Sequence, residues 1–282
     1  MAVFLVIVIA LGWFISYYYQ SSAILYIAVF LALVMNIASY WYSDKISLSL
    51  AKAVPADRAQ HPELFQVTEN LAITAGLPMP NLFVIPDPAP NAFATGRNKE
   101  HASVAVTQGL LGMMDKNELS GVIAHELSHI GNRDILLQSV VVVLVGFIAI
   151  LAHIFTRSMW FSGGRRRNSE GGGQLGLILM VIGIIFVILS PIIAQLIQLA
   201  ISRRREFLAD ADGALLTRYP EGLASALEKI KAHSEPMATA NNATAHMYIS
   251  NPFGPKSSSG LARLFMTHPP TDERIAVLRG MK

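Results

Sequence analysis

The stretch AHELSHI, residues 124–130, places two histidines four positions apart, with a glutamate directly after the first. Upstream, Asp115 and Glu118 have the D-x-x-E spacing of a capping box, and apolar residues then recur at helical spacing as far as Gly131. This pattern predicts an amphipathic helix that begins near 115 and ends near 131. Residues four apart lie on the same helix face, so the two imidazoles would point the same way.

Two imidazoles on one helix face can direct ring nitrogens at one ion, so we predict His125 and His129 as metal ligands. Glu126 is offset by one residue and would lie beside the metal, where it can accept a proton from a bound water. The alternative is that two solvated histidines share a helix face. The chain has no cysteine, so disulfides and thiolate ligands are excluded, and any zinc must be bound by His, Asp or Glu.

A catalytic zinc also needs a third protein ligand and an open position. The extended H-x-x-G-x-x-H pattern fails because positions 132 and 135 are Asn and Ile. In RRREFLADADGA, residues 203–214, Glu206 and Asp210 are again four apart at the start of a helical pattern. We predict Glu206 as the third ligand and Asp210 as the carboxylate that accepts the free N–H of a ligating imidazole. The alternative for both is a charged helix face at a membrane boundary.

Long apolar runs at about 2–18, 23–42, 136–155 and 175–201 indicate a membrane protein. The mean hydropathy of +0.44 and the 15% of charged residues are too apolar for an ordinary soluble fold. The first two runs predict a hairpin of two spans; the alternative, a cleavable signal peptide, is disfavoured because there is no basic n-region. The last two runs predict two further spans, and the alternative is a buried helical hairpin in a large core.

The predicted ligands constrain the topology, because residues before and after the last two runs must meet on one side of the membrane. Lys45, Lys52 and Arg58 follow the second run and three arginines at 203–205 follow the fourth, which places the catalytic side in the cytoplasm. Three further arginines at 165–167 contradict this rule if both intervening runs span. A re-entrant or surface-lying hairpin would remove the conflict.

Two polar segments remain, and together they are long enough to bury one core. They predict helices at 63–75 and from Pro220 onward, strands at 81–85 and 101–107, and a loop over 232–260. The chain is therefore divided into a two-span transmembrane hairpin (1–42), a first catalytic part (43–135), two further hydrophobic helices with a Gly/Arg loop (136–201) and a second catalytic part (202–282). The predicted class is a mainly α membrane protein with about four transmembrane helices and a cytoplasmic α+β domain.

HELSH, EFLAD at 206–210, NAFATG at 91–96 and THPPTDERI at 267–275 together resemble the HtpX-type family of integral-membrane zinc metallopeptidases over nearly the whole chain. The resemblance extends more loosely to CAAX prenyl endopeptidases. It implies a zincin-like catalytic domain with one Zn²⁺ ion per chain, bound by His125, His129 and Glu206, with Glu126 as the base and Asp210 behind a ligand histidine. It also implies a bacterial or archaeal plasma (inner) membrane location and a role in stress response and membrane protein quality control.

The same resemblance suggests a strand edge along which an extended substrate could lie. The residues concerned are Asn91, Ala92, Phe93, Ala94, Thr95, Gly96, His101, Ala102, Ser103, Val104, Ala105 and Val106. A purely structural strand is the alternative. His268 and Arg274 are candidates to stabilise the oxyanion or to brace the site, or they belong to a loop and a helix with no role in catalysis. His153 lies inside the third apolar run, near enough to its end to reach the interface.

The expected function is an endopeptidase that cleaves misfolded or unassembled membrane proteins, with the lipid bilayer and other membrane proteases as candidate partners. Nucleic acid is not expected, since the net charge of +3 comes from basic residues that are dispersed or crowded at the ends of apolar runs. A non-catalytic, zinc-stabilised adaptor is the second hypothesis, although pure binding would not require Glu126. A metal transporter is the third, and it would place several polar ligands inside its spans.

Overall fold

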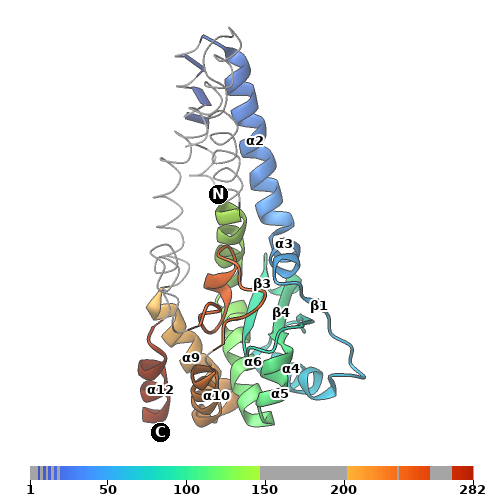
Figure 1. Ribbon diagram of the computed structural model, residues 1–282, viewed down its shortest axis with the longest axis vertical. Helices are drawn as coiled ribbons and strands as arrows, with labels where there is room; N and C mark the ends of the chain where they lie inside the picture. The colour runs from blue at the N-terminus through green and yellow to red at the C-terminus, as the bar shows by residue number, and fades with distance from the viewer. Residues whose placement is uncertain are drawn as a thin grey trace, which may run out of the picture. The chain divides into compact units, whose positions relative to one another are not determined.

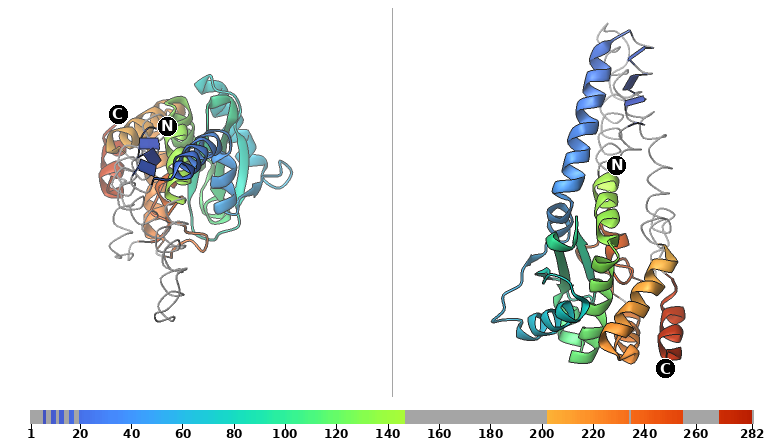
Figure 2. Two further views of the ribbon diagram at one scale, coloured as in Figure 1. Left: turned by 90° about the horizontal axis from the view of Figure 1, so that it is seen from above. Right: turned by 180° about the vertical axis from the view of Figure 1, so that it is seen from behind.

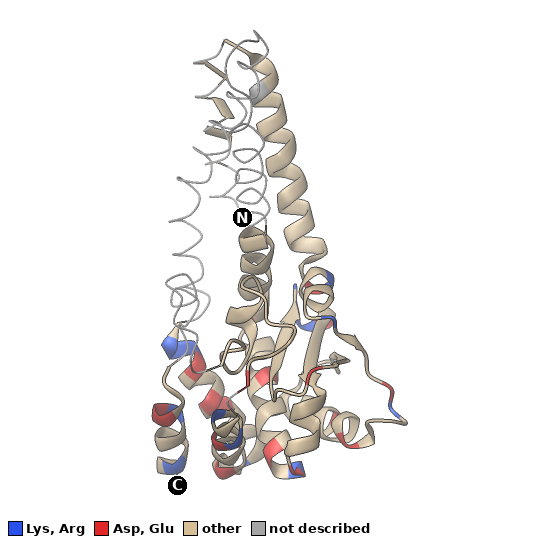
Figure 3. Cartoon of the chain, viewed as in Figure 1, with Lys and Arg blue, Asp and Glu red and all other residues tan. Residues whose placement is uncertain are grey.

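The computed structural model describes residues 20–146, 202–233, 235–254 and 269–281, with scattered positions before residue 20. The chain divides into two compact units, Met1–Tyr42 with Val143–Gln195 and Ser43–Val142 with Leu196–Lys282. In the first unit the main described element is α2 (Ser22–Trp41), a helix of 20 residues. Figure 3 shows α2 without a single charged residue, as its sequence requires.

Within the described ranges, no helix taken singly has the length and apolar composition needed to cross a membrane. Two pairs of consecutive helices meet that requirement together: Leu25–Trp41 with Ser43–Leu50, and Lys116–Gly131 with Asp134–Gly146, the latter bent by 85°. The predicted span at 175–201 lies outside the described residues, as do most of the span at 2–18 and the second half of the span at 136–155.

The second unit contains a four-stranded mixed sheet: β1 (Val54–Pro55), β2 (Asn81–Ile85), β3 (Ala92–Gly96) and β4 (Ala102–Thr107). The strand order is β1-β2-β4-β3, in which only β2 and β4 run parallel. The predicted strand at 81–85 is confirmed. The strand predicted from 101 begins at Ala102, because His101 ends a 3₁₀ helix, η1 (Lys99–His101), whose last N–H is bound by the Asn98 side chain.

Besides the sheet, the second unit contains several helices. They are α3 (Ser43–Leu50), α4 (Pro62–Ala75), α5 (Gln108–Met113), α6 (Lys116–Gly131), α9 (Arg203–Thr217), α10 (Pro220–Ala232) and α12 (Thr271–Gly280), with a short η2 (Ala245–Met247) in the predicted loop. Figures 1 and 2 show α6 between the sheet on one side and α9 and α10 on the other. Two polar segments that are far apart in sequence therefore build one helix-rich domain, whose described residues share an apolar core.

The capping box predicted for α6 is present. The Asp115 carboxylate accepts the N–H groups of Asn117 and Glu118 at 2.8 and 2.9 Å, and the Glu118 carboxylate accepts the Asp115 N–H at 2.8 Å. Glu118 also accepts bonds from Lys229 at 2.6 Å and Ser225 at 2.7 Å on α10. Burial raises the pKa of Glu118, but the Lys229 ammonium and the other donors outweigh it and hold the pKa below its usual value. The start of α6 is thereby tied to α10.

Removing this cap should destabilise the domain. Asp115→Ala leaves two backbone N–H groups without their acceptor, and we expect the free energy of unfolding to fall by about 1 kcal/mol. Denaturant unfolding of the detergent-solubilised chain measures the change. Asp115→Asn is the matched control, since its side-chain oxygen can still cap the helix; equal losses in the two variants would show that capping is not the cause.

Candidate metal centre

The histidines of AHELSHI and the glutamate of EFLAD converge in the interior of the second unit. His125 and His129 lie one turn apart on α6, Glu206 lies in the first turn of α9, and all three are buried. Their potential ligand atoms all lie within 4.8 Å of one another. Nε2 of His125 is 3.8 Å and Nε2 of His129 is 3.6 Å from the Glu206 carboxylate. Two imidazoles and a carboxylate are a donor set that suits zinc, so the residues fit the implied ion.

A glycine on α9 allows this helix to pack closely against α6. The cluster of His125, His129 and Glu206 depends on this close packing. A β-carbon at Gly213 would lie 3.1 Å from the backbone nitrogen of His125, which is closer than a side chain normally approaches. Because Gly213 has none, α9 can cross α6 at the level of the first histidine. Glu206 and Asp210 precede this contact on the same helix and are thereby brought beside the histidines.

The first histidine is backed by a carboxylate that an arginine holds. Nδ1 of His125 is 3.0 Å from Oδ1 of Asp210, and Arg274 donates from Nη2 to Oδ1 at 2.6 Å and from Nε to Oδ2 at 2.8 Å. Burial would raise the pKa of Asp210, but the Arg274 charge and these bonds lower it to about 2. Burial and the nearby Arg274 lower the pKa of His125, which favours the neutral imidazole that a metal requires. Asp210 thus lies where the sequence placed it.

The second histidine is backed in the same way by residues that sequence reasoning missed. Nδ1 of His129 is 3.1 Å from Oδ2 of Asp134, and Nη1 of Arg205 is 3.0 Å from Oδ1 of the same carboxylate. Burial alone would lower the pKa of His129, but Asp134, Glu206 and Glu126 raise it to about 9. The available signal was positional: an acidic residue five positions after His129, beyond the helix end, and an arginine immediately before Glu206.

Glu126 connects the cluster to the sheet. Its carboxyl group is buried and accepts a hydrogen bond from the backbone N–H of Ala94 on β3. Burial and the nearby Glu206 charge raise the pKa of Glu126 to about 7, against the opposing effects of His129, the Ala94 N–H and Arg274. A carboxyl group that titrates near neutral pH can both take up and release a proton there, which is what a general acid–base group must do.

Only one of the two strands in the predicted substrate edge lies at an edge of the sheet. β3 is an edge strand, but β4 lies between β2 and β3 and its backbone takes part in both ladders. The prediction is therefore wrong for Ala102, Ser103, Val104, Ala105 and Val106, which form the centre of the sheet. It is also wrong for His101, which is exposed in η1 and bonds to Asn98.

The outward edge of β3 is partly occupied by the chain itself. The Ala92 carbonyl accepts the N–H of Ile249 at 3.0 Å, and the Asn91 side chain donates to the Ser250 carbonyl at 2.9 Å. The Phe93 ring is fully buried and packs edge-to-face on Tyr248, which is a structural role. The backbone of Ala94 is the part of the predicted edge that bonds to Glu126, the residue between the two candidate histidine ligands.

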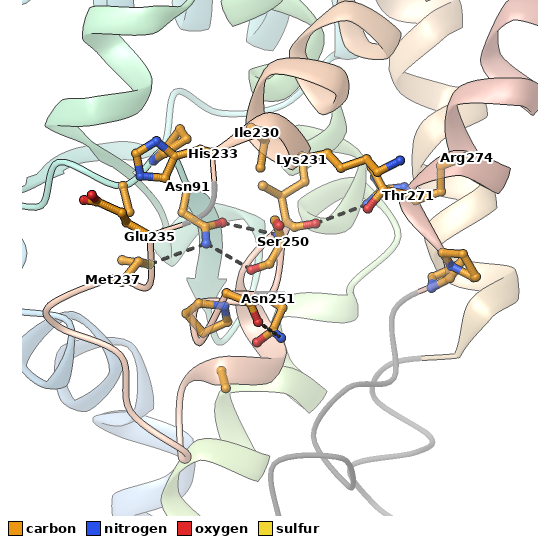
Figure 4. A pocket seen from close by; sticks show the side chains of 18 of the residues that line it. Asn91, Ile230, Lys231, His233, Glu235, Met237, Ser250, Asn251, Thr271 and Arg274 are labelled. Atoms are coloured by element: carbon orange, nitrogen blue, oxygen red, sulfur yellow. Dashed lines mark hydrogen bonds between the residues drawn. The ribbon is translucent and has the colours of Figure 1, made fainter. Parts of the chain in front are cut away.

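Arg274 braces the cluster and borders a cavity. Besides its bonds to Asp210, its Nη1 donates to the Ile249 carbonyl at 3.2 Å and lies 3.7 Å from Glu206. The adjoining cavity has a volume of about 420 Å³ and is also lined by Asn91, His233 and Glu235. Figure 4 shows Arg274 on α12 at one side of this cavity and His233 at the other. The remaining candidates, His268 and His153, lie outside the described residues.

An H-E-x-x-H helix beside the edge strand of a small sheet, with a carboxylate from a second helix completing the cluster, defines a metallopeptidase centre. The profile of peptidase family M48 matches residues 58–282, and the chain belongs to this family. It is a metalloprotease, as the sequence predicted.

Curated relatives agree with this assignment. The chain is 49% identical over 280 residues to "Protease HtpX homolog" of Caldanaerobacter subterraneus subsp. tengcongensis, covering 99% of this chain and 92% of the relative. It is 46% identical over 286 residues to the Lactobacillus acidophilus protein of the same name, covering 100% and 95%. For the Pyrococcus furiosus protein the identity is 49% over 255 residues, covering 90% and 85%.

The fold also resembles that of a solved structure, Ste24p from S. mikatae. The TM-score is 0.52 at 20% sequence identity, and the match covers 96% of this chain but 62% of the length of that one. At this identity the likeness concerns the fold alone. Taken together, the family and its relatives support a membrane-associated metallopeptidase.

Proposed function

We propose that this chain is a zinc-dependent endopeptidase of a bacterial or archaeal plasma membrane that cleaves misfolded or unassembled membrane proteins at a cytoplasm-facing site. One observation carries the proposal. Glu126 accepts a hydrogen bond from the edge strand β3 while its neighbours on the same turn, His125 and His129, converge with Glu206. A proton-transferring carboxylate thus lies between the candidate metal ligands and the edge strand β3.

In this proposal His125, His129 and Glu206 hold the zinc. Asp210, itself held by Arg274, keeps His125 in the orientation that turns Nε2 toward the metal. When bound, the ion would polarise a peptide carbonyl and lower the pKa of a water. Glu126 takes the proton of the attacking water and returns it to the amine that leaves. The products are a new carboxyl terminus and a new amino terminus, with one water consumed.

The proposed substrate class follows from how β3 can bind a chain. Pairing at a strand edge uses backbone N–H and C=O groups, so it selects an extended segment and makes little demand on its side chains. Unfolded or unassembled proteins offer such segments, and folded ones do not. The charge-free helix α2, followed by Lys45, Lys52 and Arg58, supports the membrane location, the predicted spans and the cytoplasmic orientation.

A direct test compares one integral membrane protein in its folded and unfolded forms as substrates for the purified chain in detergent with zinc. We expect rapid cleavage of the unfolded form, little cleavage of the folded form, and loss of cleavage when a chelator removes the metal. Fragments are measured by gel electrophoresis and mass spectrometry. Binding of the unfolded form without any hydrolysis would favour an adaptor instead, and equal cleavage of both forms would refute the proposed selectivity.

A further inference from the structure

His129, the second histidine, is held by Asp134 and Arg205, two residues to which the sequence patterns assign no role. We propose that Asp134 and Arg205 are a positioning pair for His129 that sets the metal affinity of the centre; this rests on the proposed function, in which His129 binds zinc. Neither residue touches substrate. They act through the imidazole of His129 and, by adjacency in the chain, through Glu206.

The geometry of Asp134 selects one tautomer of His129. Nε2 of this imidazole faces Glu206 at 3.6 Å, whereas Nδ1 faces the Asp134 carboxylate at 3.1 Å. In the neutral imidazole that a metal requires, an acceptor at Nδ1 keeps the proton there and leaves the lone pair on Nε2, which is the atom turned to the candidate metal position. Asp134 is 5% exposed, so water competes little for its oxygens.

Arg205 fixes the carboxylate from its other side. Its Nη1 lies 3.0 Å from Oδ1 of Asp134, so each oxygen of the carboxylate has its own partner. With both oxygens engaged, the carboxylate cannot rotate without losing a charge-assisted bond. Because the Arg205 side chain is 36% exposed, solvent screens this ion pair and its contribution should be the smaller of the two.

The pair also joins two distant parts of the chain at the cluster. Asp134 opens the helix Asp134–Gly146, directly after the left-handed residue Arg133, and Arg205 lies in the first turn of α9. The next residue after Arg205 is the third candidate ligand, Glu206. One ion pair thus orients a ligand histidine through its carboxylate and a ligand glutamate through the backbone of α9. Movement of either helix end would disturb both ligands together.

The experiment measures zinc dissociation constants of the full detergent-solubilised chain by competition with a chromophoric chelator. For Asp134→Asn we expect a constant about 10 to 100 times that of the wild type, since loss of such a partner has this effect elsewhere. The amide has one acceptor oxygen, which Arg205 would claim, leaving an NH₂ group toward Nδ1 and favouring the wrong tautomer. For Arg205→Met we expect the zinc dissociation constant to rise about tenfold. In Arg205→Lys, which keeps the positive charge, this rise should be smaller.

The double variant Asp134→Asn with Arg205→Met should bind zinc no more weakly than Asp134→Asn alone, because Arg205 acts through the carboxylate. Arg204→Met is the matched control: it removes the same charge from the neighbouring, exposed position and should keep wild-type affinity. At saturating zinc the variants should keep the wild-type KM. With Co²⁺ in place of zinc, the visible ligand-field bands should shift in Asp134→Asn and stay unchanged in Arg204→Met.

Wild-type zinc affinity in both Asp134→Asn and Arg205→Met, with unfolding curves showing a folded chain, would overturn the proposal. Fully additive losses in the double variant would do the same. These measurements do not depend on hydrolysis. If the wild type binds zinc tightly but cleaves no protein, the proposed function fails while the positioning pair is still tested.

Discussion

Glu126→Gln should abolish peptide hydrolysis while the zinc dissociation constant stays close to the wild-type value. The amide is nearly isosteric with the carboxylate and its oxygen can still accept the Ala94 N–H, so the packing of α6 on β3 is retained. It cannot take a proton from the attacking water or return one to the leaving amine. A positioned general base contributes about 10²- to 10⁴-fold to a rate, so the loss in kcat should fall in or above that range.

The measurement is the initial rate of cleavage of an unfolded membrane protein, together with the zinc content of each variant by metal analysis. Glu69→Gln is the control, since it removes an exposed carboxylate from α4 by the same chemical change and should cleave at the wild-type rate. Cleavage by Glu126→Gln at the wild-type rate would show that this carboxylate is not the base. Loss of zinc from that variant would show that Glu126 acts as a ligand instead.

Glu206→Gln should lose the metal itself. The carboxylate supplies one of the three converging ligands and the only formal negative charge among them, so the amide is a far weaker zinc ligand. Mutation of a residue that only hydrogen-bonds to a ligand weakens metal affinity about 10- to 100-fold. Removal of a ligand itself should weaken the affinity by more than this. Activity should fall with the metal and return only in part at high zinc concentration.

Thermal unfolding gives a readout for Glu206→Gln that is independent of catalysis. Zinc that binds only the folded chain raises its Tm, so added zinc should stabilise the wild type and have little effect on Glu206→Gln. Asp212→Asn is the control on the same helix: its carboxylate bonds to Asn132 rather than to the cluster, and its response to zinc should equal that of the wild type. An equal zinc-induced rise in Tm in Glu206→Gln would exclude Glu206 as a ligand.

Local elements were predictable because their signals are local. The capping box of Asp115 and Glu118 marks the start of α6, and Pro220 marks the start of α10. The histidine spacing placed two imidazoles on one face, and spacing within EFLAD identified the buried carboxylates of Glu206 and Asp210. Each of these inferences depends on residues within about four positions of one another.

The features that were not predicted from the sequence share one cause: they depend on contacts between segments that are distant in the chain. The alternation in β4 does not show that β3 pairs on one side and β2 on the other, so the sequence predicts an edge where the structure has a central strand. The role of Arg205 depends on its contact with Asp134, which lies 71 residues earlier in the chain. The N–H of Ile249 that covers the Ala92 carbonyl had no signal in the sequence of either segment.

By itself, the sequence determined the apolar character of the chain, the helix that carries His125 and His129, and the chemistry available at those positions. These follow from composition and from the helical period, which act within a few residues. Only the tertiary structure decided the order of the strands, the support behind each histidine and the approach of Glu206 to both. Such contacts depend on how buried surfaces pack and on which buried polar groups find partners, and neither is set by residues that are neighbours in the chain.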